Sequence, residues 1–186
     1  AASDVYKRQI IAVALVLVFS AALFVYLKQD ENSAIGKISF QTTDLTGETV
    51  DDSIFADYEL TMINIWGTFC NPCIEEMPDI EELYGEMQIQ NVNIIGVISD
   101  VGYPVRSKET YEEAIRIVEE TGVTFKNILP DQSLESKLLN RTTGIPTTIF
   151  VDKNGNMVGK MVVGSQSKLQ YQNLIEDCMK QIGEGS

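Results

Sequence analysis

Two short apolar runs without charged residues constrain the fold most strongly: Leu60–Trp66 (LTMINIW) and Val92–Ser99 (VNIIGVIS). Runs of this length are typical of strands that are buried on both faces. The stretch between them, from Asn71 to about Gln88, repeats apolar residues at spacings of three and four, which predicts a helix. A strand, a helix and a second strand in this order imply a parallel pair joined by a crossover.

The rest of the chain continues this alternation. Two short strands are expected within Phe40–Val50, around a turn at Asp44–Gly47. Further helices are expected at Ser107–Glu120, Asp131–Asn140 and Lys168–Ile182, and further strands at Thr147–Val151 and Met157–Val163, joined by a turn at Lys153–Asn156. The predicted class is α/β, with a mixed central sheet, helices on both faces and a leading β-hairpin.

The first segment differs from the rest of the chain. Ile10–Leu27 contains 18 residues without a charge, which as a helix would span roughly one bilayer core. Lys7 and Arg8 precede this run, so the positive-inside tendency places the short N-terminus in the cytoplasm. A single transmembrane helix at 10–27 is therefore expected. It would leave the remainder of the chain on the extracytoplasmic side of a bacterial-type cell membrane.

Two domains follow from this division: residues 1–33 hold the N-terminus, the anchor and a tether, and residues 34–186 hold the globular domain. A cleaved signal peptide is the competing interpretation, because Ser20-Ala21-Ala22 offers small residues at a cleavage position. The apolar run continues beyond that point, which favours a retained anchor.

Composition excludes several kinds of site. The chain has no histidine and 3 cysteines, so it cannot form a Ser-His-Asp or Cys-His catalytic pair, or a zinc site of four cysteine and histidine ligands. No metal is expected. The formal net charge is −13 and its excess lies entirely in residues 34–186, which argues against a nucleic-acid partner.

The motif that carries chemistry is Cys70-Asn71-Pro72-Cys73, at the point where the first apolar strand gives way to a helix. Unpaired backbone N–H groups and the helix dipole at such a position stabilise a thiolate. Cys70, at the exposed end, is predicted to be the attacking thiolate, and Cys73, one turn on, the resolving thiol. A zinc half-site and a purely structural disulfide are the other interpretations of the pair.

The residues around this motif resemble a known family. Trp66–Pro78 (WGTFCNPCIEEMP) is similar to the active-site stretch of the membrane-anchored, thioredoxin-like proteins of the TlpA/ResA type. Gly144–Thr148 (GIPTT) looks like the cis-proline loop of that family, and the turns at Asp44–Gly47 and Asp152–Gly155 fall at corresponding places. The resemblance covers roughly residues 35–183.

The resemblance implies a thioredoxin-like fold with an N-terminal hairpin and a helical insert, outside the membrane. It also implies thiol-disulfide oxidoreductase activity, usually reductive, on protein disulfides. In such proteins the substrate is often the Cys-x-x-Cys-His segment of an apocytochrome c, and a membrane thiol transporter supplies the electrons. No glycine-rich phosphate loop occurs, so no cofactor is expected beyond the redox-active Cys70–Cys73 disulfide.

Carried over by position, Cys70 matches the nucleophile, Cys73 the resolving thiol and Pro146 the cis-proline. Ile145 would supply the backbone that pairs with an extended substrate. Trp66 is expected to bind substrate beside the site, and a core aromatic is the other interpretation of this residue.

One departure from the pattern concerns the proton of Cys73. Thioredoxin carries a buried aspartate two residues before its tryptophan, and here that position is Asn64. An amide cannot accept the proton, so Glu76, three residues after Cys73 on the same helix face, becomes the candidate. A solvated surface charge is the other interpretation of Glu76.

Three alternatives to a reductase remain at this point. The same dithiol would serve an oxidase that introduces disulfides, and a related family reduces peroxides with a single attacking cysteine. The third is an anchored binding module with a permanent disulfide. Cys178, on the apolar face of the last helix, is expected to be a buried and inert thiol.

Overall fold

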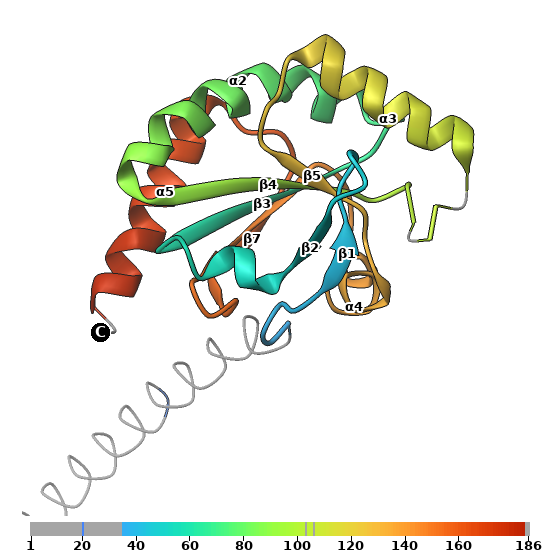
Figure 1. Ribbon diagram of the computed structural model, residues 1–186. Helices are drawn as coiled ribbons and strands as arrows, with labels where there is room; N and C mark the ends of the chain where they lie inside the picture. Colours follow the sequence, from blue (N-terminus) through green and yellow to red (C-terminus); the bar gives the residue numbers. More distant parts are fainter. Residues whose placement is uncertain (1–19, 21–34, 103, 106, 185–186) are drawn as a thin grey trace, which may run out of the picture. The chain divides into compact units, whose positions relative to one another are not determined.

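Five strands form the central sheet, in the order β5-β4-β3-β6-β7 (Figure 1). Their bounds are Leu60–Trp66 for β3, Val92–Ile98 for β4, Lys126–Ile128 for β5, Thr147–Asp152 for β6 and Met157–Val163 for β7. β3 is parallel to β4, and β4 to β5, whereas β6 is antiparallel to both β3 and β7. The predicted mixed sheet is confirmed, and its central strand is the apolar run that precedes the cysteines.

The computed structural model describes residue 20 and residues 35–102, 104–105 and 107–184. The chain divides into two units, Ala1–Ala34 and Ile35–Ser186, and the second carries the fold. The predicted transmembrane segment Ile10–Leu27 lies outside the described residues apart from Ser20. Within the described ranges, no helix combines the length and the apolar character that a membrane crossing needs.

Helices and a small hairpin cover the two faces of the sheet (Figure 1). Three helices share an apolar core with one face: α2 (Asn71–Met87), α3 (Lys108–Thr121) and α5 (Lys168–Glu184). The other face is covered by the hairpin of β1 (Gln41–Thr43) and β2 (Thr49–Asp51) and by α4 (Gln132–Lys137). Short 3-10 turns at Asp52–Phe55 (η1), Gln88–Gln90 (η2) and Leu139–Arg141 (η3) complete the elements.

The pleat of β3 explains why its sequence is apolar throughout. Alternate side chains of a strand point to opposite faces. Leu60, Met62 and Trp66 pack in the core beneath α2, α3 and α5, and Ile63 and Ile65 pack beneath the hairpin and α4. All five side chains have no exposed surface. Since both faces are covered, every position of the strand must bury its side chain.

The helix ends follow local capping rules. α2 begins directly after the loop that leaves β3, with Cys70 as the N-cap and a proline in the first turn, where a missing N–H costs no helix hydrogen bond. The Ser107 hydroxyl caps α3, which ends at Gly122 in the left-handed region (φ 71°). The helix expected at Asp131–Asn140 is shorter: α4 ends at Lys137, and a 3-10 turn at Leu139–Arg141 follows.

Gly96 of β4 lies where two side chains from neighbouring strands meet. A Cβ at this position would stand 2.0 Å from Oδ1 of Asn127 and 2.9 Å from Nε1 of Trp66. These two atoms form a buried hydrogen bond of 2.8 Å, with Trp66 donating. A side chain at position 96 would therefore break the bond and displace the tryptophan beneath the active-site loop.

We expect Gly96→Ala to lower the free energy of unfolding by about 2 to 4 kcal/mol, since it overpacks the core and leaves two buried polar groups unpaired. Urea denaturation measures the change. Gly85→Ala is the matched control: Gly85 is exposed within α2 with open space around it, so this variant should be more stable by roughly 0.5 to 1 kcal/mol. Equal stability of the two variants would contradict the account of Gly96.

Candidate active site

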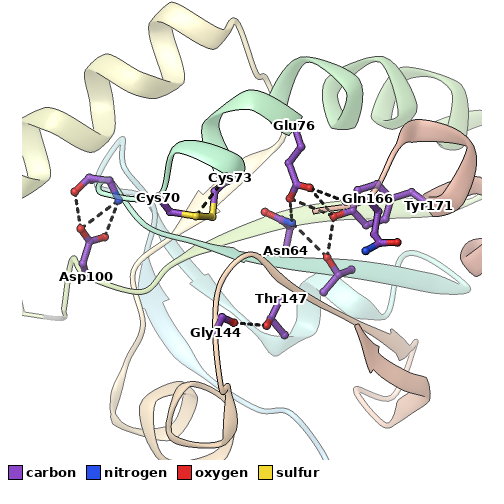
Figure 2. The surroundings of a disulfide bond; sticks show 11 residues. Asn64, Cys70, Cys73, Glu76, Asp100, Gly144, Thr147, Gln166 and Tyr171 are labelled. Atoms are coloured by element: carbon purple, nitrogen blue, oxygen red, sulfur yellow. Dashed lines mark hydrogen bonds between the residues drawn. A yellow bond between two sulfur atoms is a disulfide. The ribbon is translucent and has the colours of Figure 1, made fainter. Parts of the chain in front are cut away.

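Cys70 and Cys73 form a disulfide at the amino end of α2, with an S–S distance of 2.04 Å and Cα atoms 5.3 Å apart (Figure 2). Their surroundings differ in one respect that matters for reactivity. Cys73 has no exposed surface, whereas Cys70 retains 6%. An incoming thiol or disulfide can therefore reach only Cys70 from solvent. The Sγ of Cys70 also accepts the backbone N–H of Cys73 at 3.3 Å, an interaction that favours a thiolate once the bond is reduced.

The carboxyl end of β4 holds the loop between β3 and the cysteines. The backbone N–H of Thr68 donates to both carboxylate oxygens of Asp100, at 3.1 and 3.2 Å, and the Thr68 hydroxyl donates to the same group at 2.5 Å (Figure 2). Ser99 donates its N–H to the carbonyl of Trp66 at 2.7 Å. These contacts fix the chain two residues before Cys70.

The loop before β6 lies beside the cysteine loop. The Ile145–Pro146 peptide bond is cis, as the resemblance implies. The Pro146 carbonyl accepts the N–H of Gly164 at 2.8 Å, which ties the loop to the end of β7. A Cβ at Gly67 would lie 3.1 Å from Cδ1 of Ile145, so the missing side chain lets the two loops approach. The cis-proline loop therefore borders the residues that lead into Cys70.

Apolar side chains border the cysteine and proline loops. Phe69, directly before Cys70, is 71% exposed, and Val163 at the end of β7 is 51% exposed. Cγ1 of Val163 lies 3.7 Å from the position that a Cβ on Gly144 would take, so it flanks the proline loop. Val163 was not predicted, because it follows the motif by ninety residues and belongs to an ordinary strand pattern.

Glu76 lies inside the protein and not on its surface. Its side chain is 5% exposed and contacts groups from three other segments (Figure 2). Nδ2 of Asn64 donates to Oε1 at 3.0 Å, the Gln166 N–H donates to Oε2 at 3.1 Å, and the Tyr171 hydroxyl lies 3.2 Å from both oxygens. The interpretation of Glu76 as a solvated surface charge is therefore wrong.

The charge state of Glu76 reflects two opposing effects. Burial raises the pKa of this carboxyl above its ordinary value, because it disfavours the charged form. Hydrogen bonds from Ser165, Asn64, Gln166 and Tyr171 lower the pKa in part, because each donor stabilises the carboxylate. The net direction is upward, which brings the group closer to the pH range in which a thiol exchanges its proton.

Trp66 occupies a different place from the one expected. It has no exposed surface, and its Nε1 donates to Asn127 in the core below the cysteine loop. A substrate cannot reach a side chain in this position. The prediction that Trp66 binds substrate is thus corrected to a structural role, because the pleat of β3 directs this side chain under α2 together with Leu60 and Met62.

The third cysteine lies apart from this site. Cys178 of α5 is free and buried, as predicted, and its Sγ is 3.9 Å from the carbonyl of Val158. Burial, and then the charge of Asp177, raise the pKa of the thiol to about 12, which keeps it protonated and unreactive. Among the described residues, no group of three or more Cys, Asp and Glu side chains is placed to bind a metal ion.

A Cys-x-x-Cys disulfide at the start of the helix after a central strand, with a cis-proline loop beside the loop that leads into it, defines a thioredoxin-fold protein of the thiol-disulfide class. Residues 37–173 match the family described as AhpC/TSA. The chain therefore belongs to the AhpC/TSA family, and within it to the thiol-disulfide oxidoreductases of the ResA type, as the following relatives show.

The thiol-disulfide oxidoreductase ResA of Geobacillus kaustophilus is 30% identical over 179 residues, which cover 91% of this chain and 95% of that protein. The ResA of Geobacillus thermodenitrificans is 33% identical over 150 residues, which cover 73% of this chain and 79% of that protein. The crystal structure of a thioredoxin-family thiol:disulfide interchange protein from Chlorobium tepidum covers 77% of this chain and 94% of its own, with 19% identity and a TM-score of 0.63. This last similarity supports the fold alone.

We expect Asn64→Asp to make stability fall as pH rises. The change puts a second carboxyl about 3 Å from Glu76, so the folded pair keeps a proton to a pH at which both groups of the unfolded chain have lost theirs. The folded state then binds more protons, and the free energy of unfolding decreases with pH, by about 1 to 3 kcal/mol relative to the wild type at pH 7. Denaturation at pH 5 and pH 7 measures this difference, and an equal loss at both values would contradict it.

Proposed function

We propose that this protein reduces disulfide bonds of exported proteins, from a position tethered to the outer face of the cell membrane. The observation that carries the proposal is the asymmetry of the disulfide: Cys70, at a helix N-terminus, keeps 6% of its surface exposed, whereas Cys73 has no exposed surface. Such a pair suits a cycle in which one sulfur meets the substrate and the other resolves the intermediate.

The cycle begins with both cysteines reduced. The Cys70 thiolate attacks one sulfur of a substrate disulfide, so that a Cys70–substrate bond forms, the substrate S–S bond breaks and the second substrate sulfur leaves as a thiolate that takes up a proton. Cys73 then loses its proton and attacks Sγ of Cys70, which releases the first substrate sulfur as a thiol. Two electrons have passed to the substrate, and the Cys70–Cys73 disulfide seen in this structure is the product. An external dithiol restores the reduced form.

Glu76 is proposed to accept the proton of Cys73. It follows Cys73 by three residues on α2, and its raised pKa suits a group that takes up and returns a proton. In the oxidised state, Glu76 accepts hydrogen bonds from Asn64, Gln166 and Tyr171, and Ser165 adds a further one. Transfer to Glu76 would occur in the reduced state, where Cys73 carries a proton.

The substrate is proposed to bind as an extended segment along the cis-proline loop. The backbone of Ile145 and the ring of Pro146 would lie against the residues beside the substrate cysteine, and exposed Phe69 would cover an apolar neighbour. The segment around an apocytochrome c Cys-x-x-Cys-His site is one candidate, by resemblance to the family, and other exported proteins with accessible disulfides are equally compatible.

Tethering is supported by the uncharged run Ile10–Leu27 and by the basic residues that precede it. With the catalytic domain outside the cell, electrons would have to come from a membrane protein that carries thiols across the bilayer. The excess negative charge of residues 34–186 favours solubility beside an anionic membrane.

The direction of electron flow is a separate prediction. We expect the Cys70–Cys73 couple to equilibrate with glutathione or dithiothreitol at a reduction potential nearer to about −270 mV than to about −120 mV, the values of a reductant and an oxidant on this fold. A potential near the second value would instead support the alternative function, an oxidase that introduces disulfides.

The mechanism predicts that Cys73→Ala retains its substrate. Without a resolving sulfur, the mixed disulfide on Cys70 cannot collapse, so the variant should accumulate covalent adducts in cells, which non-reducing gels and mass spectrometry would identify. Cys178→Ala is the matched control, since it removes a buried thiol that takes no part in the cycle; it should exchange disulfides normally and trap nothing. Wild-type exchange rates in Cys73→Ala, or peroxide consumption that survives Cys73→Ser, would contradict the dithiol mechanism.

A further inference from the structure

Glu76 is surrounded by hydrogen-bond donors that come from distant parts of the chain. Asn64 belongs to β3, Gln166 to the loop before α5, and Tyr171 to α5, and Figure 2 shows all three directed at the carboxylate. Each of these groups offers a hydrogen to Glu76. A carboxylate accepts hydrogen bonds at both oxygens, so this arrangement matches the ionised form.

The hydroxyl of Tyr171 links Glu76 to a closed ring of polar groups. The Asn64 amide nitrogen donates to Glu76 and also to Oγ1 of Thr148, at 3.3 Å, and Oγ1 of Thr148 lies 3.3 Å from the Tyr171 oxygen. A phenol has one hydrogen, so when Tyr171 donates to Glu76 the Thr148 hydroxyl must donate to Tyr171. All the hydrogens of the ring are then used, with Glu76 as the final acceptor.

The same ring can also accommodate a protonated Glu76. If Glu76 gains a proton, its hydroxyl can donate to the Tyr171 oxygen, and the phenol hydrogen can turn toward Thr148, whose own hydrogen must then turn away from Tyr171. None of these changes requires a side chain to leave its place. A hydrogen bond to a carboxylate is roughly twice as strong as one between neutral groups. The ring of polar groups therefore favours the ionised form of Glu76 but can also hold its protonated form.

We propose that Tyr171 is a positioning residue for the thiol-disulfide reaction: its phenol holds Glu76 from α5 and favours the ionised carboxylate that can take the proton of Cys73. The inference rests on the proposed function, in which Glu76 is that proton acceptor. It adds a group from the last helix, 95 residues beyond Glu76, to the machinery of the Cys-x-x-Cys motif.

The titratable groups around Glu76 are consistent with this role. Tyr171 faces it from α5, and Cys73 precedes it by one turn on α2; the groups from β3, from β6 behind Tyr171, and from the loop before α5 are neutral amides and hydroxyls. Burial, and then the charge of Glu76, raise the pKa of Tyr171 well above its ordinary value. The phenol therefore keeps its hydrogen at every physiological pH and stays a donor.

The test is the pKa of Glu76 in the full-length, oxidised protein, measured by infrared difference spectroscopy of the carboxyl group. Tyr171→Phe keeps the ring packed but removes the donor, so the pKa of Glu76 should rise by about one unit. Replacing Tyr171 with 3-fluorotyrosine makes the phenol a stronger donor and should lower the pKa. Tyr84→Phe is the matched control, because this tyrosine of α2 packs against Phe125 and its loss of a hydroxyl should leave Glu76 unchanged.

Kinetics separate this inference from the proposed function. In single-turnover disulfide exchange, Tyr171→Phe should move the limb of the pH profile assigned to Glu76 upward by the same amount, and Glu76→Gln should abolish that limb. If Glu76→Gln abolishes it but Tyr171→Phe shifts neither the pKa nor the limb, the role of Tyr171 is refuted and the proposed function stands. If Glu76→Gln leaves the profile unchanged, Glu76 is not the proton acceptor; that step of the proposed mechanism and the role of Tyr171 are then both refuted, whereas disulfide reduction through Cys70 and Cys73 is tested by the trapping experiment.

Discussion

The structure depends on the complete burial of β3. This strand lies at the centre of the sheet, with helices on one face and the hairpin and α4 on the other, so it has one possible register and a rigid position. The loop that leads to Cys70 begins at the carboxyl end of β3, and Asn64, in the middle of the strand, donates a hydrogen bond to Glu76 of α2. One strand therefore positions both the sulfur chemistry and the group proposed to handle the proton.

The polar cluster around Glu76 is unusual for the core in which it lies. Leu83, Ile80 and Met77 of the same helix are fully buried among apolar side chains, yet Glu76 has a polar partner from each neighbouring segment. A buried carboxylate without such partners would cost several kcal/mol. The partners of Glu76 offset a desolvation penalty that an apolar side chain would not incur, which supports the proposed role of this group in the reaction.

Much of this architecture could be predicted from the sequence because it is encoded locally. The apolar runs predicted β3 and β4, and the spacing of apolar residues by three and four predicted α2. The position of Cys70 between a strand and a helix indicated the redox pair. Glu76 was identified from its spacing of three from Cys73. Tyr171 and Gln166 could not be found in this way, since they follow Glu76 by 95 and 90 residues and reach it only through tertiary packing.

The prediction that Trp66 binds substrate was wrong for a different reason. An aromatic residue next to a reactive motif suggests a contact surface, but the two-residue period of β3 places Trp66 on the same face as Leu60 and Met62, under the helices. The predicted burial of this strand on both faces already indicated that Trp66 lies in the core, and its position next to the motif was given too much weight.

The complete enclosure of Cys73 has a kinetic consequence. A covalent intermediate on Cys70 can be attacked from within by a sulfur held one helical turn away, while a second molecule from solution must compete for the same atom through a narrow opening. Release is thus unimolecular, and its speed is independent of how much free thiol surrounds the protein. In the proposed cycle, each substrate would therefore leave at the same rate whether the surroundings are rich or poor in thiols.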